Sequence, residues 1–112
     1  MRTVCAAVMV FGLTAAMAGA QGAAPEQGKQ VYAAQKCQVC HSIAGVGNKK
    51  GPLDEVGTRL SADEIRQWIV GAPAMATKAN ATRKPPMKAY ANLPKEELDA
   101  LVAFLHSQKK KP

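Results

Sequence analysis

The stretch QKCQVCHSIAGVG, residues 35–47, decides the fold, because Cys37 and Cys40 are followed directly by His41. Three kinds of chemistry use such a group: a redox disulfide, part of a structural zinc site, and the covalent attachment of haem. Each of them makes a different demand on the rest of the chain. The sequence outside this stretch therefore has to supply a helix N-terminus, further zinc ligands or a second ligand for iron.

The N-terminal residues of this 112-residue chain favour export. Arg2 precedes an apolar run that ends at the small-x-small site Ala18-Gly19-Ala20, which is typical of a secretory signal peptide. The run is too short for a comfortable membrane span, which takes about 20 apolar residues; an uncleaved anchor is the alternative. We therefore predict a signal peptide over residues 1–20, a flexible lead-in over 21–24, one domain over 25–109 and a basic tail over 110–112.

Cleavage near Ala20 would remove Cys5 and leave Cys37 and Cys40 as the cysteines of the mature chain. It would also remove Arg2 and no acidic residue, so the formal net charge of +7 would fall only slightly. A basic exported domain favours acidic proteins or anionic surfaces as partners, and we expect no nucleic acid partner. Because a domain this small buries a modest core, a bulky bound cofactor would add to its stability.

Helical patterns are found in three segments, and no strand pattern of adequate length occurs, so the predicted fold class is all-α. The first helix is expected from Pro25 to Cys37, since proline suits the first helical turn. The second begins with a capping box in which Ser61 pairs with Glu64, and it ends before Pro73. Residues 42–60 and 72–92 are expected to be irregular loops because they are rich in glycine or proline.

The third helix follows Pro94 and has the clearest apolar repeat, which consists of Leu98, Leu101, Val102 and Leu105. Lys109, Lys110 and Lys111 follow it, and they are expected to form a solvated, positively charged helix end.

The position of the cysteines separates the three chemistries. A redox disulfide uses a helix N-terminus to lower the pKa of its first thiol, whereas Cys37 and Cys40 follow the C-terminal end of a predicted helix. Tetrahedral zinc needs four protein ligands, and His106 on the last helix is a distant candidate for the fourth. Cys-x-x-Cys-His is the attachment signature of c-type haem. We therefore predict one haem c bound through Cys37 and Cys40, with His41 as an axial metal ligand.

A second axial ligand is expected to be methionine, which raises the reduction potential of a histidine-ligated haem. Two candidates follow the signal peptide. Met75 lies in GAPAMAT, and Met87 lies in RKPPMKAY, where two prolines stiffen an extended backbone. Met87 is the favoured metal ligand and Met75 the alternative; either side chain could instead fill the core.

With these residues identified, the chain resembles the small bacterial class I cytochromes c from Gly28 to Leu105. The resemblance is carried by ordered landmarks: Gly28 and Tyr32, CQVCH, KKGPL, Trp68, PPMKAY, and Leu101 with Phe104. It implies a cytochrome c fold, with three main helices and irregular loops wrapped around one covalently bound haem. Glycine in the first helix would permit close approach to the last helix.

The resemblance also implies roles for residues around the haem. The carbonyl of Pro52 would accept a hydrogen bond from the His41 imidazole, Trp68 would pack near the haem and reach a propionate, and Tyr90 would pack beside Met87. Two positions depart from the family pattern. Lys88 stands where many relatives have proline after the methionine, and Pro94 stands where many begin the last helix with Ser, Thr or Asp.

The function implied is that of a periplasmic one-electron carrier and not an enzyme, acting as a monomer or a loosely associated subunit. Redox proteins with acidic docking surfaces are the expected partners, met by a positive rim of Lys36, Lys49, Lys50 and Lys88. Three alternatives remain: a haem subunit of a periplasmic dehydrogenase, a haem enzyme in which Met87 dissociates, and a thiol–disulfide oxidoreductase.

Overall fold

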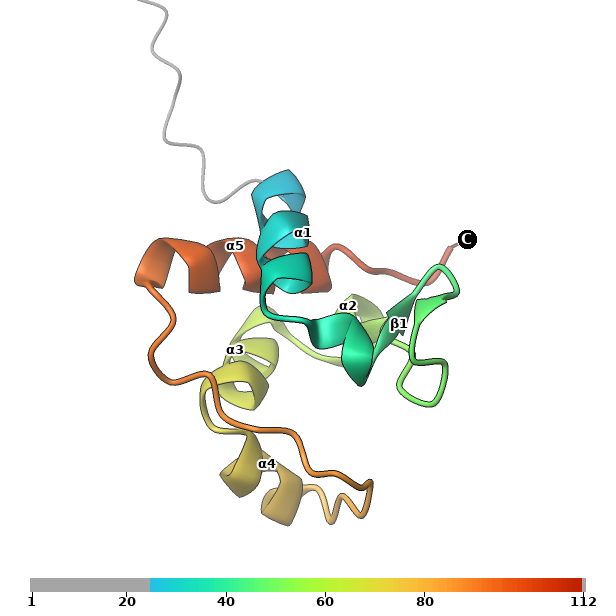
Figure 1. Ribbon diagram of the computed structural model, residues 1–112, viewed down its shortest axis with the longest axis vertical. Coiled ribbons are helices and arrows are strands. Elements are labelled where there is room, and N and C mark those ends of the chain that lie inside the picture. The colour runs from blue at the N-terminus through green and yellow to red at the C-terminus, as the bar shows by residue number, and fades with distance from the viewer. Residues whose placement is uncertain (1–24, 112) are drawn as a thin grey trace, which may run out of the picture.

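The computed structural model describes residues 25–111, in which five helices pack together and one short hairpin lies at the edge of the molecule, near α2 (Figure 1). The predicted signal peptide, the lead-in over 21–24 and Pro112 lie outside the described residues. The elements are α1 (Pro25–Ala34), the 3₁₀ turn η1 (Cys37–Val39), β1 (Ser42–Ile43), β2 (Val46–Gly47), α2 (Val56–Arg59), α3 (Ala62–Val70), α4 (Ala72–Lys78) and α5 (Lys95–His106). Strands β1 and β2 are antiparallel, with Ser42 opposite Gly47 and Ile43 opposite Val46.

Helices α1 and α5 cross at Gly28 (Figure 1). A Cβ atom at this position would collide with the carbonyl oxygen of Ala100 and with Cβ of Phe104, so only glycine allows the two backbones to come this close. Four residues further along α1, the ring of Tyr32 packs edge-on against Phe104, with 5.6 Å between ring centroids. The crossing predicted from Gly28 and Tyr32 is therefore present.

The hydrophobic core lies around α5, on which α1, α2 and α3 pack. It contains Val31, Tyr32, Val56, Ile65, Ile69, Leu101, Val102, Phe104 and Leu105. Within residues 25–111, no large side chain of this core is completely enclosed. The core is therefore thin, as expected for a domain of this size.

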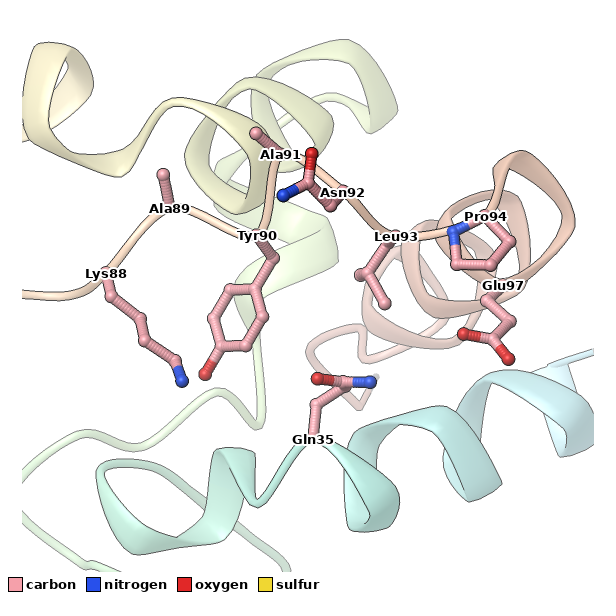
Figure 2. A pocket seen from close by; sticks show the side chains of 9 residues that line it. All are labelled: Gln35, Lys88, Ala89, Tyr90, Ala91, Asn92, Leu93, Pro94 and Glu97. Atoms are coloured by element: carbon pink, nitrogen blue, oxygen red, sulfur yellow. The ribbon is translucent and has the colours of Figure 1, made fainter.

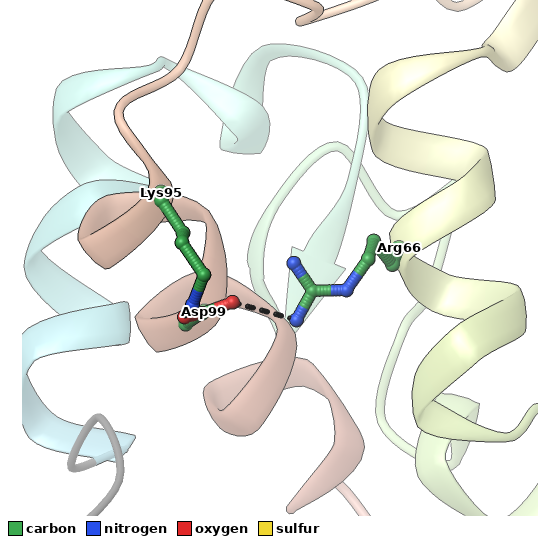
Figure 3. A network of polar contacts seen from close by, with 3 residues as sticks. All are labelled: Arg66, Lys95 and Asp99. Atoms are coloured by element: carbon green, nitrogen blue, oxygen red, sulfur yellow. Dashed lines mark hydrogen bonds and ion pairs between the residues drawn. The ribbon is translucent and has the colours of Figure 1, made fainter.

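Helix α3 has the capping box that the sequence predicts. The Ser61 hydroxyl accepts the Glu64 N–H at 3.1 Å, and the Glu64 carboxylate accepts the Ser61 N–H at 3.2 Å. An ion-pair network then ties α3 to α5: Asp99 binds Arg66 and Lys95, each at 2.7 Å (Figure 3). The Arg66–Asp99 pair therefore links α3 to α5, the helix that contributes the largest share of the core.

The chain between the predicted helices is more ordered than expected. Helix α1 ends at Ala34, earlier than predicted, and Lys36 then adopts a left-handed conformation with φ of 57°. Residues 72–78 form helix α4, because Pro73 lies in its first turn, where a missing N–H leaves no helical hydrogen bond unmade. Residues 42–60 include the hairpin and α2. The prediction of irregular loops was wrong for these parts.

The C-terminal segment is also not a free helix end. Helix α5 stops at His106, and the chain then runs along α2: the Gly57 N–H donates to the Gln108 carbonyl at 2.8 Å. The Lys109 ammonium donates to the Gly57 carbonyl at 2.9 Å, and the Lys110 N–H donates to the Thr58 hydroxyl at 2.7 Å. The segment that contains the lysines after α5 is therefore docked on α2.

Candidate functional site

The attachment segment, Cys37–His41, is a tight turn that follows the left-handed Lys36. The Cys37 carbonyl accepts the N–H groups of Cys40 at 3.1 Å and His41 at 2.9 Å. Both thiols are free and half-buried. The turn therefore gathers two thiols and one imidazole on a short piece of backbone, as attachment of one haem requires.

The His41 imidazole is oriented by a backbone carbonyl. Its Nδ1–H donates to the carbonyl oxygen of Gly51 at 3.1 Å, and the same oxygen accepts the Ser42 N–H at 3.1 Å. Since a carbonyl can only accept, Nδ1 must carry the proton, and the lone pair is on Nε2. A histidine held in this way presents Nε2 to a metal ion.

The acceptor predicted for His41 was the Pro52 carbonyl, and this prediction was wrong by one residue. Ser42 pairs with the chain on both sides of Pro52: its N–H donates to Gly51, and its carbonyl accepts the Leu53 N–H at 2.8 Å. That pairing turns the Gly51 carbonyl toward the imidazole. Pro52 itself is exposed.

Charge and burial favour the neutral form of His41. Burial lowers the pKa of His41, the hydrogen bond to Gly51 opposes that change, and the Arg83 guanidinium lowers the pKa further. The Arg83 guanidinium lies beside Gly51, and a Cβ atom at residue 51 would collide with it. The missing side chain of Gly51 therefore leaves room for Arg83. A neutral imidazole is the form that binds metals.

The Cys37 thiol is not tuned for thiol–disulfide exchange. Burial raises the pKa of the Cys37 thiol to about 11, and the nearby Cys40 adds to the effect. The attacking species in exchange is the thiolate, and reactive cysteines have lowered pKa values. Cys37 is therefore a protonated thiol at neutral pH, which does not support the oxidoreductase alternative.

The residues that structural zinc would need are not brought together. Within residues 25–111, no three side chains of His, Cys, Asp and Glu are grouped so that they could hold a metal ion. His106 lies at the C-terminal end of α5, where its Nε2 is 3.2 Å from the Lys109 ammonium. The fourth ligand considered in the sequence is thus engaged elsewhere.

The segment that contains Met87, residues 83–90, approaches the candidate site at two points. Arg83 contacts Gly51, as described above. Tyr90 lies within electrostatic reach of Cys37 and Cys40: burial raises the pKa of Tyr90, and both thiols raise it further. Met87, which is half-buried, lies between these two points in the chain.

A hydrogen bond fixes the far end of this segment to α3. The Tyr90 N–H donates to the Ile69 carbonyl at 2.7 Å. Met75 is half-buried on α4, which packs on α3. The choice of Met87 over Met75 as a metal ligand stays a prediction, supported by the neighbours of Met87.

A polar groove of about 350 Å³ lies next to Tyr90 (Figure 2). Its walls come from the end of α1, the segment after Met87 and the start of α5, with Gln35 across from Tyr90. The Lys88 ammonium sits 5.0 Å from the centroid of the Tyr90 ring. Neither the two cysteines, nor His41, nor Met87 lines this groove, which shares Tyr90 with the candidate haem site.

The residues present fit a covalently bound haem. C-type attachment needs two free thiols to form the thioether bonds and one imidazole nitrogen to bind the iron, and Cys37, Cys40 and Nε2 of His41 supply them. Half-buried apolar side chains, which leave apolar surface for a haem to cover, occur along the stretches that separate or contain the predicted site residues: Ile43, Leu53, Leu60, Trp68, Met87 and Tyr90. Trp68 lies on α3 between the buried Ile65 and Ile69, and its predicted contact with a propionate stays a prediction.

Three contributors to the site have no signal in the sequence that points to them. Gly51 supplies the acceptor for His41, Arg83 supplies a nearby positive charge, and Asn48 binds three carbonyls of the attachment segment. Gly51 and Asn48 lie in the glycine-rich stretch expected to be irregular. Their roles depend on backbone directions, which residue types do not specify.

Comparison with known proteins identifies the family of this chain. The family model described as "Cytochrome c" matches residues 25–109. The chain is 29% identical over 92 residues to cytochrome c oxidase subunit 2 of Alkalihalophilus pseudofirmus, an alignment that covers 74% of this chain and 25% of that protein. The chain thus spans about a quarter of the length of this relative. No solved structure gave a significant match. Because the family model covers most of the chain, the protein belongs to the cytochrome c family, whose function is haem-based electron transfer.

Proposed function

We propose that this protein is a periplasmic one-electron carrier with a single haem c attached through Cys37 and Cys40. The observation that carries the proposal is the His41 imidazole, held by Gly51 so that Nε2 is available, on the same short segment as two free thiols. When bound, haem supplies a ferric–ferrous couple. The residues around it bind it, orient the axial ligands and exclude water.

In this proposal His41 and Met87 are the two axial ligands. A thioether opposite imidazole raises the reduction potential, and two protein ligands leave no position for substrate. Tyr90, bonded to Ile69, holds the end of the segment that presents Met87. The protein would therefore conduct electrons without acting as an enzyme.

The docking partner proposed is a redox protein with an acidic surface. Lys36, Lys49, Lys50 and Lys88 are all exposed, and each is close in sequence to a site residue. Charges at the rim of an interface mainly steer the encounter and raise the association rate.

Export of the chain is part of the proposal. The residues proposed as a signal peptide lie outside the described part of the chain. Within residues 25–111, no helix has the length and hydropathy to span a bilayer.

A second candidate follows from the similarity to cytochrome c oxidase subunit 2. The chain could act as a haem module that delivers electrons to a terminal oxidase, either free or attached to it. Because the match covers a quarter of that relative, this remains a proposal about partners and leaves the haem chemistry unchanged.

The experiment is expression of the full chain in a host with a c-type maturation system. We expect a red product whose haem stays attached after denaturation, whose mass shows one haem per chain, and whose redox titration follows a one-electron curve. A colourless chain with two free thiols would contradict the proposal.

A further inference from the structure

We propose that Asn48 is a positioning residue for the attachment segment, Cys37–His41, and that its side-chain amide contributes to this role together with its backbone N–H. The inference rests on the proposed function, in which this segment carries the haem. No sequence pattern indicates this role, because Asn48 lies in a loop that contains no predicted metal ligand.

Every polar group of Asn48 is engaged. Its backbone N–H lies 3.0 Å from the carbonyl oxygens of Gln38 and of His41, and its Nδ2–H donates to the Val39 carbonyl at 3.1 Å. Its Oδ1 accepts the Lys50 N–H at 3.0 Å. Asn48 therefore holds three of the five carbonyls of the attachment segment.

The segment has few other restraints. It contains one 3₁₀ turn, in which the Cys37 carbonyl accepts two N–H groups. Val39 is 65% exposed, so packing does little to hold the middle of the turn. The bonds to Asn48 thus add restraints on the carbonyls of Gln38, Val39 and His41 to those that the single turn supplies.

Gly47 allows Asn48 to reach this position. Its φ is 107°, and a Cβ atom there would collide with the His41 carbonyl oxygen. The glycine therefore lets the backbone of the hairpin approach the attachment segment closely enough for Asn48 to bond to it.

Asn48 also connects the attachment segment to the group that orients the ligand. Its carbonyl accepts the Gly51 N–H at 3.1 Å, and the Gly51 carbonyl accepts the Nδ1–H of His41. One residue is thus bonded to the carbonyl of His41 and to the residue that holds its imidazole. Attachment of one haem through Cys37, Cys40 and His41 would need these groups to be held in a fixed relative position.

The test compares Asn48→Asp, Asn48→Ala and Lys50→Ala in the holoprotein. Aspartate keeps an oxygen that can accept the Lys50 N–H, but it places a carboxylate against the Val39 carbonyl in place of the Nδ2–H donor. Alanine removes both side-chain bonds. Lys50→Ala changes a neighbouring side chain and keeps the backbone N–H that Asn48 accepts, so it is the matched control.

We expect the amide exchange of Cys40 and His41 to be roughly 2- to 12-fold faster in both Asn48 variants, the range for loss of one neutral hydrogen bond. We also expect a smaller fraction of recovered chains to carry haem through both thioethers. Loading and exchange in Lys50→Ala should match the unmodified chain.

Two results would overturn the proposal. The first is wild-type amide exchange and haem loading in Asn48→Ala. The second is wild-type exchange and loading in Asn48→Asp, because the side chain would then act only by accepting the Lys50 N–H in its own turn. Complete loss of attached haem from both variants, with normal loading of Lys50→Ala, would support it. If the unmodified chain itself takes up no haem, the proposed function fails instead, so the two failures are distinguishable.

Discussion

The His41 imidazole and the Gly51 carbonyl are joined by a hydrogen bond of 3.1 Å between Nδ1 and O. This bond sets the tautomer of the imidazole and directs Nε2 toward a metal ion. It also makes the imidazole a stronger electron donor, which favours ferric over ferrous iron.

Gly51→Ala should weaken this bond, because the added Cβ would collide with the Cys40 carbonyl. A weaker donor stabilises ferric iron less, so we expect the reduction potential to rise by about 20–40 mV, equivalent to about 0.5–1 kcal/mol. Redox titration measures this change. Pro52→Ala is the control, since Pro52 is exposed and its substitution leaves Gly51 in place. Equal shifts in both variants would contradict the assignment of Gly51.

Gly28→Ala should destabilise the fold, because a Cβ atom would collide with Ala100 and Phe104 at the crossing of α1 and α5. Forced overpacking costs about 1–3 kcal/mol in the free energy of unfolding, although alanine is the better helix former. Denaturant unfolding of the holoprotein checks the prediction. Lys29→Ala, at the neighbouring exposed position, should change the stability by less than about 0.5 kcal/mol.

The ion-pair network of Asp99 should make part of the stability depend on pH. Hydrogen bonds from Lys95 and Arg66, together with their charges, lower the pKa of Asp99 below the ordinary value of 3.8. A lowered folded-state pKa stabilises the fold above the unfolded-state pKa, and this contribution is lost as the pH falls through the folded-state value. The stability difference between the unmodified chain and Asp99→Asn should be greatest near neutral pH and shrink in acid. A difference that grows in acid would contradict this role for Asp99.

The proposed docking rim predicts a charge effect on electron transfer. Lys49→Glu should slow the second-order transfer of electrons to an acidic redox partner at low ionic strength by about 10-fold or less, with the effect decreasing as salt is added. Lys29→Glu carries the same change of charge on α1 and is the control. Stopped-flow kinetics separates the two. Equal slowing by both variants would indicate net charge, and salt-independent rates would exclude the rim.

Local signals in the sequence predicted some of the structure well. The capping box of Ser61 and Glu64, the apolar repeat of the last helix and the crossing at Gly28 each depend on residue types at fixed spacings. The all-α class and the family follow from the same patterns together with CQVCH. These features lie within single helices or at one close contact.

Other features depend on long-range contacts and could not be predicted. Pro73 lies in the first turn of α4 because Gly71 ends α3 directly before it. Proline content alone does not distinguish the start of a helix from an irregular loop. The segment after α5 docks on α2 because backbone groups of Gly57 and Gln108 face each other. The acceptor for His41 is Gly51 because of the pairing around Ser42. Each result depends on the direction of backbone groups after folding.

The axial pair His41 and Met87 is the central claim, and the far-red absorption of the ferric protein tests it most directly. A thioether bound to ferric haem gives a sulfur-to-iron charge-transfer band in this region. The account predicts the band in the unmodified chain and in Met75→Ala, and its absence in Met87→Ala. A band that survives in Met87→Ala and disappears in Met75→Ala would contradict the account and assign the ligand to α4.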